Sequence, residues 1–245
     1  MTHYIYGIHA AKALLMFQSG IVIRLIVQLG RDDPAFQDCL TVAKKAGLPI
    51  EYLARKDIDR LVSEQAVHQG ILLECKALPV YSEADIENMI SSKNEPRLVL
   101  ILDGIQDPHN LGACLRVADA LGVCCVIAPK DRSVSLNATA IKVSCGAAFS
   151  TPFVQVTNLA RAMRKLQDLG LWLVGTSLNT TQSLKDIDMR GNIGIVMGAE
   201  GSGLRELTEK HCDFLAKIPM LGSVESLNVS VATGITLYEV YRQRQ

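Results

Sequence analysis

Three polar turns hold most of the residues in this chain whose types and spacing could do chemistry. Two of them, GAEGSG and SLNVS, lie in the last quarter of the sequence, and the third, DGIQDPHNLGACLR, begins at Asp103. Each leads into a pattern of apolar residues at helical spacing, and glycine lets such turns fold tightly enough for main-chain groups to face a ligand. Because turns from distant parts of a chain can converge, we expect one ligand pocket built mostly of backbone.

The first turn adds polar side chains that a simple strand-to-helix connection does not need. Asn110 can cap the helix that follows, Gly112 allows another backbone to approach closely, and Arg116 lies within that helix. Each polar residue also has a simpler interpretation: Asn110 is an N-cap only, and Arg116 belongs to a solvated face beside Asp119. The presence of the two later turns favours a functional site.

The second turn differs from the common phosphate-binding fingerprints. Its glycines follow the order GxxGxG instead of GxGxxG, and Glu200 within it would repel a pyrophosphate. Only about forty residues follow it, too few for the second half of a dinucleotide-binding domain. The glycines could also serve only to give the backbone a positive φ. A nicotinamide-dependent oxidoreductase is therefore a weak alternative.

The third turn places Ser226, Asn228 and Ser230 around a helix start. The simpler interpretation makes Ser226 or Asn228 a helix cap and nothing more. His9 and His109 have no Ser, Cys or metal-spaced partner near them in the sequence, which leaves little support for a hydrolase. We expect no metal site.

The composition narrows the class of protein. With 25 Lys plus Arg and 25 Asp plus Glu among 245 residues, the net charge is zero, so a nucleic-acid contact would need local basic patches. The 7 cysteines lie mostly in apolar runs without CxxC spacing, which indicates buried thiols in a reducing compartment. There is no apolar run of about eighteen residues and no signal-peptide pattern. We expect a soluble, cytoplasmic protein with neither a membrane nor DNA as its partner.

Two stretches with different patterns must position the turns. Residues 1–78 alternate helical and strand-like patterns, which predicts a small α/β domain. Residues 79–96 are poor in apolar residues and contain a proline, which predicts a linker with one or two helical turns at most. In the first stretch we expect helices over residues 9–17, 34–46 and 54–64, strands over 21–29 and 49–54, and a closing apolar run over 70–78.

Residues 97–245 repeat a strand-then-helix pattern. Short, continuous apolar runs are typical of strands buried on both faces of a parallel sheet, so the sequence predicts an α/β domain with a mostly parallel sheet. A last helical pattern ends the chain. The predicted strands cover residues 98–102, 123–128, 171–176 and 192–197, and the predicted helices between them cover 111–121, 138–148 and 159–169.

Together the motifs resemble those of a known family. DPHNLGACLR, GAEGSGL and IPMLGSVESLNVSVATGI are similar to the three motifs of the SpoU class, also called TrmH, of RNA ribose 2′-O-methyltransferases in the SPOUT superfamily. The similarity extends to YGIHA, AVHQGI, PKDRS and LNATA, and so covers nearly the whole chain. Within the class, the chain resembles the bacterial enzymes that methylate a guanosine of 23S rRNA.

This resemblance implies a fold and a reaction. Residues 97–245 would form a SPOUT methyltransferase domain with a trefoil knot, and residues 1–78 an RNA substrate-binding domain similar to ribosomal protein L30e. The resemblance further implies a homodimer, S-adenosyl-L-methionine as methyl donor, and 23S rRNA, free or in a large-subunit assembly intermediate, as partner. A tRNA ribose methyltransferase of the same family and a non-catalytic RNA-binding protein of ribosome assembly remain as alternatives.

The resemblance also assigns residues to the donor pocket. Gly198, Ile218 and Leu227 match the positions whose backbone groups hold the cofactor, and Thr176 and Met220 are expected neighbours. Main-chain recognition needs tightly folded loops, which glycine permits.

A second set matches the polar residues around the methyl acceptor: Asn110, Arg116, Glu200, Ser226 and Asn228. The usual account of the family makes the matching arginine the general base, but a guanidinium with a pKa above about 12 stays protonated. We therefore expect Arg116 to clamp a phosphate and stabilise the developing alkoxide. Water, phosphate or Glu200 would take the proton.

Local basic residues are the candidates for RNA contact. Lys130 and Arg132, in PKDRS, are the expected RNA-binding pair, with Lys142 on the helix that follows. Arg55, Lys56 and Arg60 form a weaker group, because acidic residues interleave with them. If phosphate contacts exist, affinity for RNA should fall steeply with salt.

Overall fold

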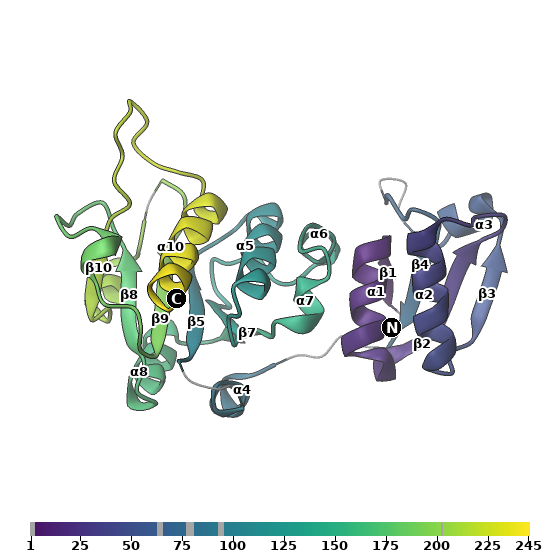
Figure 1. The fold of residues 1–245 in the computed structure, drawn as a ribbon, viewed down its shortest axis with the longest axis horizontal. Helices are drawn as coiled ribbons and strands as arrows, with labels where there is room; N and C mark the ends of the chain where they lie inside the picture. Colours follow the sequence, from purple (N-terminus) through teal and green to yellow (C-terminus); the bar gives the residue numbers. More distant parts are fainter. Residues whose placement is uncertain (1–2, 63–65, 77–80, 93–95, 202) are drawn as a thin grey trace. The chain divides into compact units, whose positions relative to one another are not determined.

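The computed structural model describes residues 3–62, 66–76, 81–92, 96–201 and 203–245. The chain divides into two compact units, one of residues 1–80 with 144–150 and the other of residues 81–143 with 151–245. Each unit combines a β-sheet with helices (Figure 1), which confirms the predicted α/β class.

The first unit is built on a four-stranded mixed sheet with the order β1-β4-β2-β3. Strands β2 and β3 are parallel, and the other neighbours are antiparallel. The strands are β1 (His3–Tyr6), β2 (Val22–Gln28), β3 (Ile50–Leu53) and β4 (Ile71–Cys75), and the helical segments are α1 (Ile8–Phe17), η1 (Ser19–Ile21), α2 (Pro34–Lys45), α3 (Arg55–Asp59) and α7 (Ala147–Ser150).

Local signals explain most of the first unit. Helix α2 begins where Asp33 accepts a hydrogen bond from the backbone N–H of Phe36, with proline at its first position. Strand β2 buries three successive residues under the helices. The prediction was wrong in two places: strand β1 was not expected, and the helix predicted over 54–64 ends at Asp59, with residues 63–65 outside the described part of the chain.

The second unit contains a six-stranded sheet with the order β10-β8-β9-β5-β6-β7, in which every neighbouring pair is parallel. All strands therefore end at one edge of the sheet, the carboxyl edge, where the following loops meet. The strands are β5 (Leu98–Asp103), β6 (Val126–Pro129), β7 (Phe153–Val156), β8 (Trp172–Thr176), β9 (Ile193–Gly198) and β10 (Phe214–Ala216).

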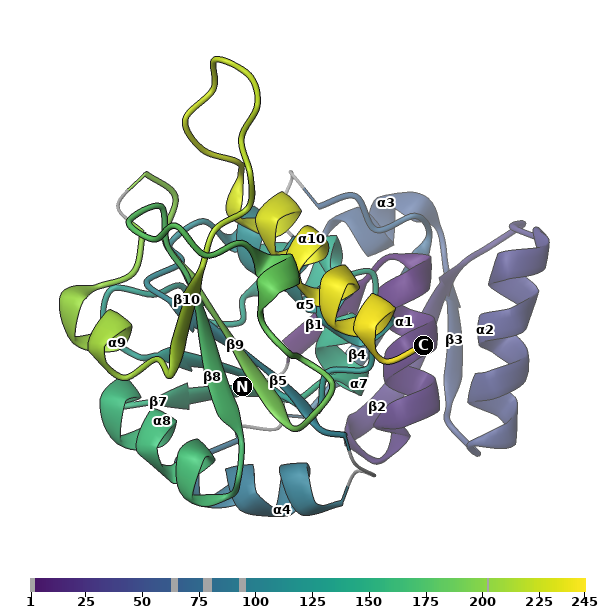
Figure 2. The same cartoon turned by 60° about the vertical axis from the view of Figure 1, so that its left-hand side comes forward.

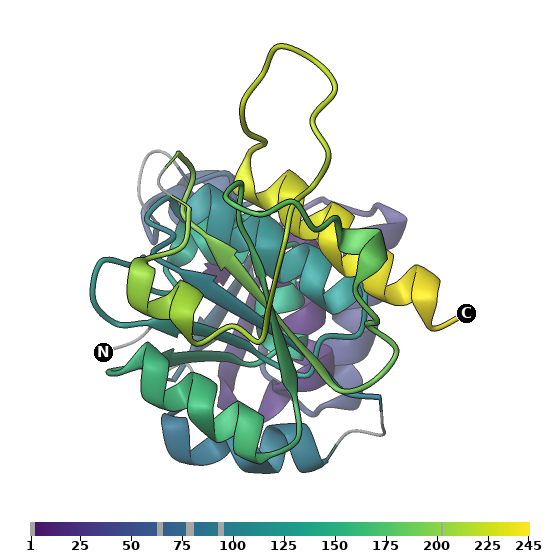
Figure 3. The same cartoon turned by 90° about the vertical axis from the view of Figure 1, so that its left-hand side faces the viewer.

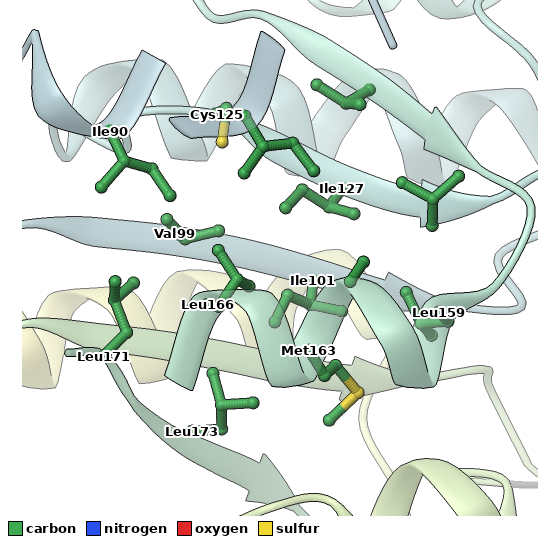
Figure 4. Close-up of a cluster of buried hydrophobic side chains, with 14 of the residues drawn as sticks. Ile90, Val99, Ile101, Cys125, Ile127, Leu159, Met163, Leu166, Leu171 and Leu173 are labelled. Carbon is green, nitrogen blue, oxygen red and sulfur yellow. The ribbon is translucent and has the colours of Figure 1, made fainter. Parts of the chain in front are cut away.

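Helices cover both faces of this sheet (Figure 3). On one face α4 and α8 pack against the strands and bury a cluster that includes Ile90, Val99, Ile101 and Met163 (Figure 4). On the other face α10 packs against α5 and β9. The helical segments are η2 (Glu83–Asp85), α4 (Ile86–Ser91), α5 (Pro108–Ala120), α6 (Ala138–Val143), α8 (Leu159–Asp168), η3 (Leu184–Asp186), α9 (Glu206–Lys210) and α10 (Val229–Gln243).

The parallel sheet confirms the predicted fold class, and three details differ from the sequence prediction. The helix predicted over 138–148 is interrupted, because Cys145 and Gly146 adopt φ values of 52° and 100°. Strands β7 and β10 were not predicted. Within the segment predicted as a linker, Ile86 and Ile90 are buried in the core of the second unit.

The segment between β10 and α10 forms a long loop that projects beyond the sheet (Figure 2). Leu221 within it is 99% exposed. No helix in the described part of the chain is long and apolar enough to cross a membrane.

Candidate functional site

A pocket of about 310 Å3 lies at the carboxyl edge of the six-stranded sheet. Its walls come from the ends of β8 and β9, the loop after β10 and the start of α10. The volume lies within the range of small-molecule sites, about 300–1,000 Å3. Seven of the predicted site residues line it: Thr176, Gly198, Glu200, Ile218, Met220, Ser226 and Leu227.

The GAEGSG loop folds back on itself beside the pocket. Ala199 and Gly203 exchange two backbone hydrogen bonds, with N···O distances of 3.1 and 2.9 Å. A Cβ on Gly198 would lie 2.1 Å from the carbonyl carbon of Gly203, so this position admits only glycine. Gly201 and Gly203 have positive φ, so glycine there serves to give the backbone this conformation. This simpler interpretation does not hold for Gly198.

Asn228 joins the three turns. Its Nδ2 donates to Oδ1 of Asn110 at 2.9 Å and to Oε2 of Glu200 at 3.3 Å. Its Oδ1 accepts the backbone N–H and the hydroxyl of Ser230, which makes it the N-cap of α10. Asn228 is thus a helix cap, as the simpler interpretation held, and also the link between the first and second turns.

Asn110 does not cap α5, which is the simpler role that the sequence offered for it. The N-cap of α5 is Asp107, whose carboxylate accepts the backbone N–H of His109 at 2.8 Å, and this bond lowers the pKa of Asp107. Asn110 lies inside the first turn of the helix, and its side chain is left to accept from Asn228. The expectation for Gly112 is confirmed, because a Cβ there would lie 2.6 Å from the carbonyl oxygen of Ala140.

Arg116 does not join this polar cluster. It lies on α5, about 9 Å further along the axis than Asn110 at 1.5 Å per residue, and is exposed. It makes no hydrogen bond or ion pair with any residue that the structure describes. Its guanidinium is therefore available to an external group.

Lys130 and Arg132 lie at the same edge of the sheet as the pocket. The Lys130 backbone N–H donates to the carbonyl of Val156 at the end of β7. Ser133 and Val134 both donate to the carbonyl of Ile105, which holds this basic loop against the first turn. Both cations are exposed.

Sequence reasoning missed four charged or polar residues of the pocket: Ser177, Asn179, Glu209 and Lys217. Ser177 and Glu209 line it, and the Ser177 hydroxyl donates to Oε1 of Glu209 at 3.0 Å. Lys217 lines it as well. Glu209 stands in a short helix of mixed charge, so no local pattern distinguishes it from a solvated residue.

Asp103 and Arg205 were also missed as a pair. Asp103 ends β5 with a fully buried side chain, and it accepts from the backbone N–H and the guanidinium of Arg205. The two residues are 102 positions apart, so only the fold brings them together.

Sulfur and metal chemistry gain no support from the described residues. No group of three His, Cys, Asp or Glu able to hold a metal occurs among them. Burial raises the pKa of Cys114 to about 11 and that of Cys125 to about 12, so both remain thiols near neutral pH. Contrary to the expectation of buried thiols, Cys145 is exposed.

Two family models match this chain. One, described as the SpoU rRNA Methylase family, matches residues 97–238. The other, described as RNA 2′-O ribose methyltransferase substrate binding, matches residues 4–81.

Full-length relatives and a solved structure agree with these matches. The 23S rRNA (guanosine-2′-O-)-methyltransferase RlmB of Escherichia coli is 51% identical over 244 residues, with 100% of both chains covered. The enzyme of the same name from Coxiella burnetii is 49% identical over 98% of this chain and 96% of its own. The SpoU methyltransferase AviRb of Streptomyces viridochromogenes has a TM-score of 0.81 at 23% identity over 99% of this chain and 90% of its own, and has also been solved with AdoMet.

Proposed function

Because this chain belongs to the SpoU rRNA methylase family, we propose that it transfers a methyl group from S-adenosylmethionine to the 2′-oxygen of a guanosine ribose in 23S rRNA. The relatives that support this substrate match the whole chain, including the part that matches the substrate-binding model. This full-length similarity favours rRNA over the tRNA alternative.

One observation in the structure carries the proposal. Asn228 donates to both Asn110 and Glu200, and so gathers one polar residue from each of three distant turns beside a glycine-lined pocket. A non-catalytic RNA-binding protein would not need this arrangement. The geometry therefore favours an enzyme over the ribosome-assembly alternative.

The lining of the pocket fits S-adenosylmethionine. Leu178, Ile218 and Leu227 offer an apolar wall for the adenine, and the glycine-rich loop exposes main-chain groups. Glu200 and Glu209 favour a cationic ligand, while Lys217 can pair with the carboxylate of the amino-acid part. The predicted residues Thr176, Gly198, Met220 and Leu227 would complete its contacts.

When bound, this donor supplies an electrophilic methyl group on a sulfonium. The chain has to orient the ribose and accept the proton of its 2′-hydroxyl. Glu200 is the carboxylate nearest to the polar cluster, and the amide of Asn228 holds one of its oxygens, which leaves Oε1 to accept a proton or a hydrogen bond. Ser226 would help to shape the acceptor pocket.

We assign Arg116 to the RNA. Its exposed guanidinium has no partner among the described residues, so it can bind a phosphate and stabilise negative charge on the ribose oxygen. Lys130 and Arg132 would bind the backbone further along the same edge. Their replacement by alanine should weaken RNA binding and reduce its dependence on salt.

We infer that the protein works as a homodimer. Val231, Ile235 and Tyr238 follow one face of α10 and are 51%, 40% and 57% exposed, and such a stripe is typical of an interface. Leu221 and Val224 in the projecting loop add to the exposed apolar surface. Light scattering should give twice the mass of one chain, and Ile235→Asp should reduce it.

Family membership also supports the trefoil knot in residues 97–245, the L30e-like form and RNA-binding role of residues 1–78, and a cytoplasmic location, where 23S rRNA is modified. These remain part of the proposal. Separately produced residues 1–78 should bind fragments of 23S rRNA if the role is correct.

A labelled-methyl assay tests the reaction. Unmodified 23S rRNA, tRNA and a large-subunit assembly intermediate are each incubated with the protein and tritiated S-adenosylmethionine. We expect label in 23S rRNA or in the intermediate, in dinucleotides that resist alkaline hydrolysis because the 2′-oxygen is blocked. Label in tRNA alone would instead favour the tRNA alternative.

A further inference from the structure

The buried carboxylate of Asp103 stands directly behind the site. Its side chain is 0% exposed, and a buried carboxylate is costly unless partners satisfy its oxygens. Arg205 supplies them: its Nε donates to Oδ1 at 2.6 Å, its Nη2 pairs with the same oxygen, and its backbone N–H donates to Oδ2 at 3.1 Å. The side chain of Arg205 itself is 42% exposed.

These two residues hold both ends of the GAEGSG loop. At the start of the loop, Gly198 is paired with Asp103 in the register of β5 and β9. Beyond its end, Arg205 returns to the same aspartate. Between them the Ala199 and Gly203 backbones are bonded to each other, so the loop is closed twice.

The same point contacts the other turns. A Cβ built on Gly104, the residue after Asp103, would lie 3.8 Å from both the Cβ of Ala199 and the carbonyl oxygen of Arg132. The aspartate therefore lies where the first turn, the GAEGSG loop and the basic loop meet. The loop that it anchors supplies five lining residues of the pocket, Gly198, Ala199, Glu200, Gly201 and Gly203, and Leu204 directly after the loop lines it too.

We propose that Asp103 and Arg205 form a positioning pair, which fixes the GAEGSG loop so that Glu200 meets Asn228 and the loop backbone closes the donor pocket. The inference rests on the proposed methyl transfer and extends it to two residues outside the predicted site. The pair acts through the loop, and neither residue is asked to touch the reacting atoms.

Three variants test the pair. Arg205→Ala removes the guanidinium, Asp103→Asn removes the charge but keeps the shape, and Arg205→Lys keeps a cation without the planar fork. Arg244→Ala is the control, because Arg244 binds backbone carbonyls at the opposite edge of the sheet and its loss should affect stability alone.

Three quantities are measured for each variant below its melting temperature: the Kd for S-adenosylmethionine by calorimetry, the single-turnover rate of methyl transfer to 23S rRNA, and amide hydrogen exchange at Ala199 and Gly203. For Arg205→Ala we expect donor binding about tenfold weaker, slower transfer at saturating donor, and faster exchange at both amides. Asp103→Asn should behave similarly, and Arg205→Lys should recover part of the loss. Arg244→Ala should lower the melting temperature and leave all three quantities within about twofold of wild type.

The positioning role is contradicted if Arg205→Ala and Asp103→Asn bind the donor and transfer methyl groups as wild type does. It is also contradicted if Arg244→Ala shows the same losses, since they would then follow from stability. If Arg205→Ala does not fold, Arg205→Lys and Asp103→Asn decide the question. Wild-type protein that transfers no methyl group would overturn the proposed function, while the exchange rates would still report whether the pair holds the loop.

Discussion

The two edges of the six-stranded sheet use their polar groups in opposite ways. At the amino edge, Arg244 binds backbone, donating to four carbonyl oxygens, those of Pro96, Arg97, Met189 and Gly191. At the carboxyl edge, side chains bind side chains: Asn228 joins Asn110 to Glu200 at the pocket.

At the amino edge, polar side chains stabilise the fold by binding backbone groups. Asn192 accepts the backbone N–H of Arg97 at 2.8 Å, and Asp213 accepts that of Leu173 at 2.7 Å. Burial lowers the pKa of Arg244, while its carbonyl partners satisfy its N–H groups. Each side chain here completes backbone that the sheet leaves unpaired.

At the carboxyl edge, some hydrogen-bond donors and acceptors of the described residues are available to a ligand. Glu200 and Glu209 face the pocket with one oxygen each bound by Asn228 and Ser177. Arg116, further along the helix that starts at this edge, is without a partner among the described residues. We therefore expect changes at the amino edge to alter stability, and changes at the carboxyl edge to alter ligand binding and catalysis.

The largest effect should come from Asn228→Asp. Aspartate still caps α10, but it cannot donate to Asn110 and it repels Glu200. We expect methyl transfer about a hundredfold slower or more, as for the loss of a precisely placed polar group in an active site, with the melting temperature nearly unchanged. If the melting temperature of the variant also fell strongly, the slower methyl transfer would follow from lost stability. The two edges would then not differ in role.

The next largest effect should come from Gly198→Ala, because the new methyl group would collide with the Gly203 backbone and open the loop. We expect the Kd for S-adenosylmethionine, measured by calorimetry, to rise about tenfold or more. Gly191→Ala, before the other end of β9, is the matched control, since its Cβ would meet nothing within 4 Å. Equal affinity in the two variants would show that the loop is not a wall of the donor site.

Arg244→Ala should act on stability alone. Hydrogen bonds to a charged group contribute about 1.5–3 kcal/mol, so the free energy of unfolding should fall by about 2 kcal/mol or more. Urea unfolding measures this loss, and calorimetry should give an unchanged Kd for the donor. A weakened donor affinity would mean that the two edges are coupled through the sheet.

The smallest effect should come from removing the ion pair between Glu83 and Arg161. Neither residue belongs to the polar groups described above for the two edges. Hydrogen bonds from Arg161 hold the pKa of Glu83 below its usual value. The stabilisation from this exposed pair is therefore small, is present above the ordinary pKa of a glutamate, and is lost as the pH falls through the lower folded pKa of Glu83. Arg161→Ala should lower the melting temperature slightly at pH 7, and the difference from wild type should vanish once the pH is below the lowered pKa of Glu83 and its carboxylate is protonated.

Sequence patterns predicted the long buried strands of this molecule better than its short strands and the breaks between helices. Strand β5 is buried at all six positions, so its continuous apolar run was easy to recognise. Strand β10 has three residues and an exposed first position, too short for any pattern. The break after α6 depends on the left-handed backbone of Cys145, which residue type does not reveal.

The site shows the same contrast between residues that local motifs predict and contacts that depend on packing. Gly198, Glu200 and Leu227, which line the pocket, were predicted because they stand in motifs that resemble a known family. The cap that the simpler interpretation offered for Asn110 belongs to Asp107, and Asp107 with Pro108 marks the helix start more strongly. The contact between Asp103 and Arg205 depends on the packing of β5 beside β9, which no local spacing encodes.

The most direct test of the account is a map of ribose methylation across 23S rRNA after incubation with S-adenosylmethionine and either wild-type protein or Asn228→Asp. If three turns form one methyl-transfer site, wild type should modify a single guanosine ribose and the folded variant should leave it almost unmodified. Absence of ribose methylation by wild type, or equal modification by the variant, would contradict the account.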